Sequence, residues 1–520
     1  MPPPRSGRSV GCYAPRVNLG ALRGRSGTLA KALGALSILV ALAAWALASP
    51  VGASPDEDFH LASAWCGHGT LDGACEEGPD SASREVPLAF SHIACFGFVP
   101  ETSASCQGDA LASSEQLKVT ARGNFTGDYP PVFYFFMSLF VGRDIVVSVA
   151  VMRLVNALLF VAMIAATYIA SPPRLRRPLL GGIAVTVVPL GMFIIPSINP
   201  SSWAVLSAAT LMVCVLGYMT TEERCPRLLI GGLAGLSVLF GAGARADAAM
   251  YAVVAIAAAL ILTVRLGAQH LRRAIYPVVL AIVAGVSFLS AGQSGAIEGG
   301  QPQALTLARV WDLLVDVPGL WAGSLGTWGL GWVDTPMPAL VWVSALGIFA
   351  ATVFVAITGM DRRRVLAIGL VGAAVWLVPA YIQYLSGVPV GSDVQPRYIL
   401  PLLTMLAVTA MVRLDGGVFR LTRGQRWVFV LALSAANAVA LHTNLRRYIT
   451  GIDVDSLNLN AHREWWWGLP ISPLAVWVLG SLAFAAGLAV LSREFTGVIA
   501  AREEPATAHE EPELEVEAPD

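Results

Sequence analysis

Apolar segments of roughly 20 residues recur along almost the whole chain, and a helix of that length is needed to cross the hydrocarbon core of a bilayer. Composition agrees with this pattern. Of the residues, 55% are hydrophobic and only 13% are charged, whereas soluble domains carry about 25% charged residues. The sequence therefore predicts an all-α membrane protein whose helices form one polytopic bundle.

We expect about twelve membrane spans along the chain. Their predicted positions are 29–49, 145–170, 178–196, 202–220, 228–243, 247–264, 274–292, 338–358, 365–385, 398–413, 427–444 and 470–491. Basic residues should collect in cytoplasmic loops. They do collect in the N-terminal tail and in every alternate loop, whereas the intervening loops are poor in arginine. Both termini are therefore predicted to be cytoplasmic. The net charge of −1 hides this asymmetry and argues against a nucleic acid as partner.

The same pattern divides the chain into a membrane domain and two tails. The predicted membrane domain covers residues 29–491 and includes three external segments, which are 50–130, 293–337 and 445–469. The basic tail 1–28 and the acidic tail 492–520 have compositions that are typical of disordered segments. Both tails are predicted to lie on the cytoplasmic side of the membrane.

Four cysteines lie in the first external segment, at Cys66, Cys75, Cys95 and Cys106. An oxidising compartment favours two disulfides there, for which three pairings can form. Spacing favours Cys66–Cys75 and Cys95–Cys106, and four free thiols are the alternative. These cysteines do not indicate a zinc site, because no paired C-x-x-C or H-x-x-x-H pattern accompanies them.

Charged residues inside a membrane bundle are costly and tend to be functional. Here Arg153 is the main candidate near the middle of a predicted span, and the other polar residues gather at the external ends of spans. These residues are Asp56, Glu57, Asp58, His60, Asp128, Tyr129, Arg245, Asp247, Asp334, Asp393, Gln395, Arg397 and Tyr398. Carboxylates, a histidine and arginines are thus predicted to share one face of the bundle, as a site facing the outer leaflet would require.

The segment ASPDEDFHLAS, residues 53–63, follows the first span and has two interpretations. In the first, Ser54 to Glu57 forms a capping box that merely starts a helix along the membrane surface. In the second, Asp56 and Glu57 share one helix face with His60, and a carboxylate beside an imidazole removes a proton from a hydroxyl group. Zinc chemistry of the HExxH kind is not supported, because this pattern is DExxH with one histidine.

Arg397 also has two interpretations. It either snorkels to lipid headgroups or clamps a phosphate, since a guanidinium keeps its charge and binds phosphate with two hydrogen bonds. Arg245 and Asp247 either pair with each other across a tight turn or contribute to the same site. Asp334 is a candidate for a turn or a helix cap as much as for catalysis.

Four segments together resemble a known family pattern. They are SPDEDFH (54–60), DYPPVFYF (128–135), GSLGTWGLGWVDTPMP (323–338) and QPRYILPLL (395–403). With the order of the spans, they make most of residues 30–490 similar to the bacterial polytopic membrane proteins called domain of unknown function 2142, whose members resemble GT-C type glycosyltransferases. That family tends to have Pro where this chain has Asp58 and Gly where it has Pro396, so we assign no role to Asp58.

The resemblance implies a GT-C-like bundle with a long first external loop, in the plasma membrane of a bacterium. It also implies an inverting transfer of a sugar from a polyprenyl-phosphate carrier to a cell-envelope glycan or lipid. By that analogy Asp56 would be the general base, with Glu57 as the competing candidate, and His60 would orient the base or contact the acceptor. The donor phosphate would be held by Arg397 with Tyr398 and Arg245, and the further candidates are Asp128, Asp247, Asp334 and Gln395.

No cofactor is predicted, and no sequence feature supports a divalent metal. Two other classes of function fit the spans: a transporter or flippase for a lipid-linked glycan, and a non-catalytic scaffold that binds envelope partners. Transporters usually place their polar sites near the middle of the membrane on interrupted helices. The clustering of polar residues at the ends of spans argues against a transporter.

Overall fold

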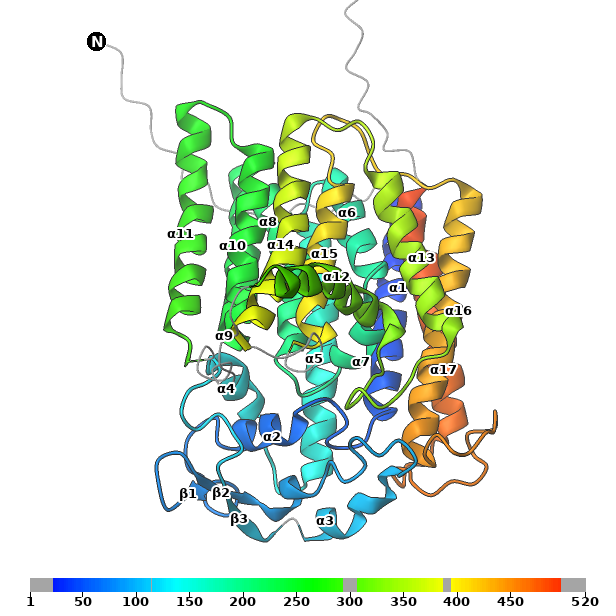
Figure 1. The fold of residues 1–520 in the computed structure, drawn as a ribbon. Helices are drawn as coiled ribbons and strands as arrows, with labels where there is room; N and C mark the ends of the chain where they lie inside the picture. Colours follow the sequence, from blue (N-terminus) through cyan, green and yellow to red (C-terminus); the bar gives the residue numbers. More distant parts are fainter. Residues whose placement is uncertain (1–21, 114, 293–305, 387–393, 497–520) are drawn as a thin grey trace, which may run out of the picture.

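The computed structural model describes residues 22–113, 115–292, 306–386 and 394–496. Long helices stand side by side in a bundle, and a smaller layer of short helices and strands covers one end of it (Figure 1). Asp393 and most of both predicted tails lie outside the described residues, as does the first part of the predicted segment 293–337.

Ten of the described helices are long and apolar enough to cross a membrane, by length and composition. They are α1 (Leu22–Leu47), α5 (Ile145–Ala170), α8 (Ser201–Thr220), α9 (Arg224–Ala244), α10 (Ala246–Thr263), α11 (Ala268–Ser290), α13 (Ala339–Ala356), α14 (Arg362–Ser386), α16 (Arg423–Ile449) and α17 (Pro473–Leu491). A helix suits this environment because it satisfies its backbone hydrogen bonds internally. Each coincides with a predicted span, so the prediction of a multi-pass helical membrane protein is confirmed.

The two remaining predicted spans, 178–196 and 398–413, take other forms. α6 (Pro173–Ala184) meets the segment made of η3 (Val187–Gly191) and α7 (Met192–Ile194) at a bend of 83°, as in a broken span or a re-entrant loop. Val188, which precedes Pro189, has the extended angles φ −97° and ψ 132°. A residue before proline is pushed out of the helical region, which explains the break. α15 (Pro396–Met411) is apolar but shorter than the other spans.

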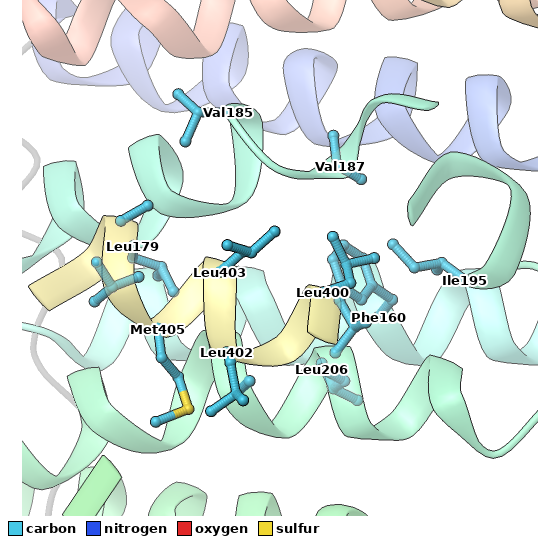
Figure 2. Packing of buried hydrophobic residues seen from close by; sticks show 14 of the residues in the cluster. Phe160, Leu179, Val185, Val187, Ile195, Leu206, Leu400, Leu402, Leu403 and Met405 are labelled. Atoms are coloured by element: carbon cyan, nitrogen blue, oxygen red, sulfur yellow. The ribbon is translucent and has the colours of Figure 1, made fainter. Parts of the chain in front are cut away.

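α15 is almost fully buried, which explains how a short helix can belong to the bundle. Two glycines of α6 allow its close approach. A Cβ atom at Gly181 would lie 2.5 Å from the sulfur of Met411, and one at Gly182 would lie 2.3 Å from a methyl carbon of Val408. Figure 2 shows the apolar core around α15, which includes Phe160, Leu179, Val187, Ile195, Leu206, Leu400, Leu402, Leu403 and Met405.

The layer that covers one end of the bundle comes mainly from the first predicted external segment. Its helices are α2 (Glu57–Trp65), η1 (Leu88–Ser91), η2 (Ala104–Gln107), α3 (Gly108–Ala112) and α4 (Val132–Ser138). A small antiparallel sheet has the strand order β1 (Glu76–Glu77), β2 (Arg84–Pro87) and β3 (Leu117–Thr120). The sequence reasoning did not anticipate this sheet, because its strands are short and carry no clear alternation of apolar residues.

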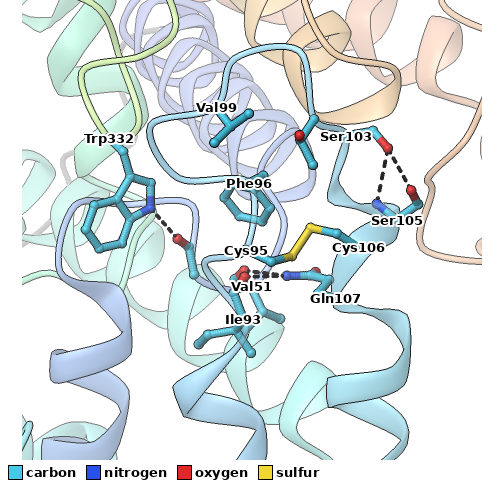
Figure 3. The surroundings of a disulfide bond; sticks show 12 residues. Val51, Ile93, Cys95, Phe96, Val99, Ser103, Ser105, Cys106, Gln107 and Trp332 are labelled. Atoms are coloured by element: carbon cyan, nitrogen blue, oxygen red, sulfur yellow. Dashed lines mark hydrogen bonds between the residues drawn. A yellow bond between two sulfur atoms is a disulfide. The ribbon is translucent and has the colours of Figure 1, made fainter.

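Disulfides join Cys66 to Cys75 and Cys95 to Cys106, which is the pairing that spacing favours, with Cα–Cα distances of 5.4 and 6.2 Å. Figure 3 shows the surroundings of the second bond. Next to it, the side-chain amide of Gln107 donates to the carbonyl oxygens of Val51 and Ile93, both at 2.9 Å. The disulfide therefore joins two parts of the layer, and the Gln107 amide fastens the layer to the segment that follows α1.

A further helix, α12 (Leu307–Ala322), lies across the long helices (Figure 1). It continues into η5 (Gly323–Thr327), and the chain then turns back at residues 328–338 before α13 begins. The indole N–H of Trp332 in this turn donates to the carbonyl oxygen of Gly52 at 3.0 Å. The second predicted external segment is thus attached to the first one. The last helix in the described part of the chain is η6 (Ser492–Phe495).

Candidate functional site

An ion pair joins the first and fourth of the family-like segments. Arg397, the second residue of α15, donates from Nη2 to Oδ2 of Asp56 at 2.7 Å, although 341 positions separate the two residues. The same nitrogen donates to the hydroxyl oxygen of Tyr398 at 3.0 Å, and Nη1 hydrogen-bonds the side chain of Gln395. Only 3% of Arg397 is exposed. Its guanidinium therefore faces the protein interior and does not snorkel to lipid headgroups.

The Asp56 carboxylate is accessible, with 39% of its side chain exposed. Its second partner is Arg122, whose Nη2 lies 3.3 Å from Oδ1 and which also pairs with Asp58. Burial by itself raises the pKa of Asp56, but the charges of Arg397 and Arg122 outweigh burial and hold that pKa below its usual value. Asp56 is therefore ionised at neutral pH.

Arg245, between α9 and α10, belongs to the same cluster. It pairs with Asp247 through two hydrogen bonds of 2.8 and 2.9 Å, as one of the two interpretations of this turn expected. Its guanidinium carbon also lies 4.3 Å from the ring centre of Tyr398 and 5.7 Å from that of Tyr129, while the guanidinium carbon of Arg397 lies 4.8 Å from the Tyr398 ring. The Tyr398 ring thus contacts both arginines, which brings two positive charges to one place.

His60 lies beside this cluster and is only 1% exposed. Its Nδ1 shares a hydrogen bond of 2.8 Å with the hydroxyl group of Tyr134, and its ring meets Tyr129 edge to face at 5.7 Å. Burial lowers the pKa of His60 to about 3. The imidazole is therefore neutral at physiological pH, and its hydrogen bond goes to Tyr134, not to Asp56.

The surroundings of Glu57 differ from those of the neighbouring Asp56. It is fully buried, and its carboxylate receives two hydrogen bonds, of 2.9 and 3.1 Å, from Nη2 of Arg153 on α5. The backbone N–H groups of Ser54 and Ile198 also donate to it, at 3.2 and 3.3 Å. An enclosed and saturated carboxylate has no opening to an acceptor. Glu57, the competing candidate for the base, therefore holds the bundle together, and Arg153 near the middle of α5 is its partner.

The expected capping box forms only in part. Glu57 does reach back to the backbone N–H of Ser54, but α2 begins at Glu57, and Asp56 before it has a left-handed φ of 59°. Ser54 is consequently not the N-cap, and its hydroxyl group has no hydrogen-bond partner among the described residues. The left-handed conformation of Asp56 turns its side chain away from Glu57 and toward Arg397.

Two further candidates, Asp334 and Asp128, form contacts within or beside their own loops. Asp334 pairs with the buried Arg447 of α16 at 2.8 Å and accepts the backbone N–H of Phe98 at 3.1 Å. It therefore links three segments, in keeping with the turn interpretation. Asp128 accepts the hydroxyl group of Thr126 at 3.2 Å within the loop that leads to α4.

A small pocket adjoins Arg397 where the third family-like segment meets the fourth. Glycines allow the backbones to approach, since a Cβ atom at Gly323 would lie 2.7 Å from Pro396 and one at Gly331 would lie 2.6 Å from the hydroxyl oxygen of Tyr448. The pocket lining includes Pro55, Leu190, Gly329, Val333, Gln395 and Arg397. Segments far apart in the sequence thus surround the Arg397 side of the ion pair.

Sequence reasoning missed two residues of this cluster. Arg122 is a partner of Asp56, but it lies in a polar stretch with no periodic pattern, so the sequence carried no signal for it. Tyr134, the partner of His60, lies in the segment DYPPVFYF, which had been noted only as part of the resemblance. In the described ranges, no group of three or more His, Cys, Asp or Glu side chains is placed to hold a metal ion.

The fold and the cluster define a multi-pass membrane protein with an ion-paired polar site at one end of its bundle. A family profile described as "Predicted membrane protein (DUF2142)" matches residues 39–406. The chain belongs to this family. No curated protein matches it.

Among solved structures, the chain is similar to the crystal structure of the Archaeoglobus fulgidus oligosaccharyltransferase tethered with an acceptor peptide containing the NVT sequon via a disulfide bond. The identity is 12%, the TM-score is 0.32, and the match covers 80% of this chain and 55% of that one. The chain thus spans about half the length of that protein. A TM-score of this size carries no argument about fold or activity, so the function has to be argued from the residues of this chain.

Proposed function

We propose that this protein is a GT-C-like glycosyltransferase. It transfers a sugar from a polyprenyl-phosphate carrier to a glycan or lipid of the cell envelope, at the outer face of a bacterial plasma membrane, with both termini in the cytoplasm. The observation that carries the proposal is the ion pair of 2.7 Å between Asp56 and Arg397 at one end of the helical bundle. It supplies an accessible carboxylate and a buried guanidinium in one place.

The arginines suit a phosphate that is attached to a lipid. Arg397 and Arg245 both contact the ring of Tyr398, and a guanidinium keeps its charge at any physiological pH. Asp56 accepts a hydrogen bond from Nη2 of Arg397. In our proposal a donor phosphate takes the place of Asp56 at this nitrogen, after which Asp56 keeps only its contact with the more exposed Arg122.

This exchange prepares the base. While Arg397 neutralises Asp56, the pKa of the carboxyl group is held low and the group is a weak base. When the phosphate takes over Arg397, that stabilisation of the carboxylate is lost and the pKa of Asp56 rises. Donor binding thus leaves Asp56 paired only with the more exposed Arg122, and the carboxylate becomes a stronger base only when the donor is in place.

The transfer itself then follows an inverting course. Asp56 accepts the proton of the acceptor hydroxyl group while the hydroxyl oxygen forms a bond to the anomeric carbon of the sugar. The bond from that carbon to the phosphate oxygen breaks, and its electron pair stays on the phosphate. Arg397 and Arg245 stabilise this developing charge. His60 is neutral, donates its backbone N–H to the carbonyl oxygen of Asp56 at 3.0 Å, and positions the start of α2.

A transporter or flippase for a lipid-linked glycan and a non-catalytic scaffold are the alternatives. The pair of Arg153 on α5 with Glu57 is closed and buried, so it offers no accessible charge to a substrate within the bundle. The accessible polar groups of the cluster gather instead at its end. This arrangement favours a reaction at the membrane surface over passage through the membrane.

The test compares two neighbouring carboxylates in the full chain. Asp56→Asn removes the proposed base, whereas Asp58→Asn removes a carboxylate that pairs with Arg122 but not with Arg397. Purified variants are given radiolabelled sugars on polyprenyl phosphate together with an envelope extract as acceptor. We expect Asp56→Asn to lower turnover by about 10²- to 10⁴-fold and Asp58→Asn to change it little. Full turnover by Asp56→Asn would contradict the assignment of the base, and flipping of the donor without transfer would favour the transporter.

A further inference from the structure

A large apolar cavity lies on another side of the bundle. Its volume is about 900 Å³, near the upper end of the range of about 300–1,000 Å³ for small-molecule sites. It lies between α1, α5, α6 and α17, with walls formed by residues such as Leu42, Phe160, Ile164, Leu180 and Leu488. An open apolar space of this size suits an apolar molecule of the membrane.

The cavity opens at the end of the bundle opposite to the Asp56–Arg397 pair. Lys31 lines it near the start of α1, while Asp56 follows the other end of that helix. From Gly27 to Leu42 the cavity extends about 22 Å along α1, at 1.5 Å per residue. A bilayer is about 40–45 Å thick when its headgroups are included. The length of the cavity thus matches one leaflet together with its headgroup region.

The cavity also reaches the surface that the bundle presents to lipid. Ile169 near the end of α5 lines it and is 71% exposed. Both α1 and α5 are among the helices that can cross a membrane. A lipid chain can therefore enter from the side of the bundle without crossing a polar barrier.

The mouth of the cavity carries a surplus of positive charge. Among the described residues, Lys31, Arg176 and Arg493 line it together with one carboxylate, Glu494. Glu494 is engaged by Lys31 at 2.7 Å and by the hydroxyl group of Tyr168 at 2.7 Å. Arg176 caps the end of α5 through the carbonyl oxygen of Tyr168 at 3.0 Å, and Arg493 is exposed. Three cations against one carboxylate suit an anionic headgroup.

We infer that this cavity is a binding site for one anionic phospholipid of the leaflet opposite to the Asp56–Arg397 pair. One acyl chain of the lipid fills the apolar cavity, and its phosphate lies at the mouth between Arg176 and Arg493. The bound lipid holds α1 and α5 together at the end where the cavity separates them. This inference does not depend on the proposed sugar transfer.

The test is native mass spectrometry of the purified full chain in a neutral detergent, titrated with dioleoyl phosphatidylglycerol or dioleoyl phosphatidylcholine. Ala165→Phe places a ring inside the cavity, whereas Ala162→Phe places the same ring on an exposed position of α5 that does not line the cavity. Arg493→Gln removes an exposed charge at the mouth and leaves the packing intact.

We expect the wild-type protein to retain one phosphatidylglycerol in preference to phosphatidylcholine. Ala165→Phe should lower that retention at least tenfold and Ala162→Phe should not. Arg493→Gln should reduce the preference by about fivefold, since each basic residue near a membrane surface contributes measurably to anionic lipid binding. Equal losses in both phenylalanine variants, or an unchanged preference in Arg493→Gln, would overturn the proposal. Retention of polyprenyl phosphate in place of phosphatidylglycerol would also overturn it, because the occupant would then be a different lipid.

Discussion

Exchange of the Arg397 partner leads to a prediction in which donor binding and catalysis change in opposite directions. Asp56→Asn removes the negative charge that, under the proposed function, competes with the donor phosphate for Nη2 of Arg397. The Asp56 side chain is 39% exposed, so solvent screens the pair, and an ion pair of this kind contributes up to about 1 kcal/mol. Since about 1.4 kcal/mol corresponds to a tenfold change in affinity, we expect the variant to bind the donor up to about fivefold more tightly while it loses turnover.

The assay is equilibrium binding of a radiolabelled polyprenyl-phosphate sugar to purified protein, with turnover measured on the same samples. Asp58→Asn is the matched control, because Asp58 contacts Arg122 and leaves the Asp56–Arg397 pair in place. It should alter neither quantity by more than about twofold, the size expected for an exposed ion pair. Thermal denaturation of each variant separates a local change from a loss of fold. Weaker donor binding by Asp56→Asn, at an unchanged denaturation temperature, would refute the exchange.

Two further predictions concern stability. Glu57→Gln should destabilise the protein by about 3–5 kcal/mol, because it leaves the charge of the buried Arg153 without a partner. The double variant Glu57→Gln with Arg153→Met should lose less than the sum of the single losses, as chemical denaturation would measure, and additive losses would contradict this coupling. For His60, the folded pKa of about 3 lies below the ordinary value of 6.5, so the unfolded chain takes up the proton first. The stability that depends on neutral His60 should be complete above about pH 6.5 and fall as the pH drops toward 3, and His60→Phe should flatten this dependence in thermal melts at pH 7, 6, 5 and 4.

The positions of the membrane-spanning helices could be predicted from the sequence because they depend on local composition. A run of apolar residues long enough to cross the bilayer identifies a span wherever it occurs. At 398–413 the apolar run predicted a span, and the structure has there the shorter apolar helix α15, which is buried among other helices. The break between α6 and η3 was not predicted, because apolar content carries no information on the restriction that Pro189 places on Val188.

The candidate site could be predicted only as a set of residues. Polar side chains at the external ends of spans were visible in the sequence, and Asp56, Arg397, Arg245 and Tyr398 do lie together. The partners of the candidate residues could not be predicted from the sequence. Arg122, which pairs with Asp56, lies in a stretch with no pattern, and Asp334 pairs with Arg447.

Asp56 and Glu57 show most clearly what could not be predicted from the sequence. They are adjacent in the sequence and have the same chemistry, so the sequence alone determined that a carboxylate follows the first span but not which one is available. Only the tertiary structure decided this. Asp56 adopts a left-handed conformation with φ 59° and turns to Arg397, whereas Glu57 starts α2 and is enclosed with Arg153. The physical reason is that an ionised side chain is stabilised by the charge it meets in space, and that partner lies 341 positions away for Asp56 and 96 positions away for Glu57.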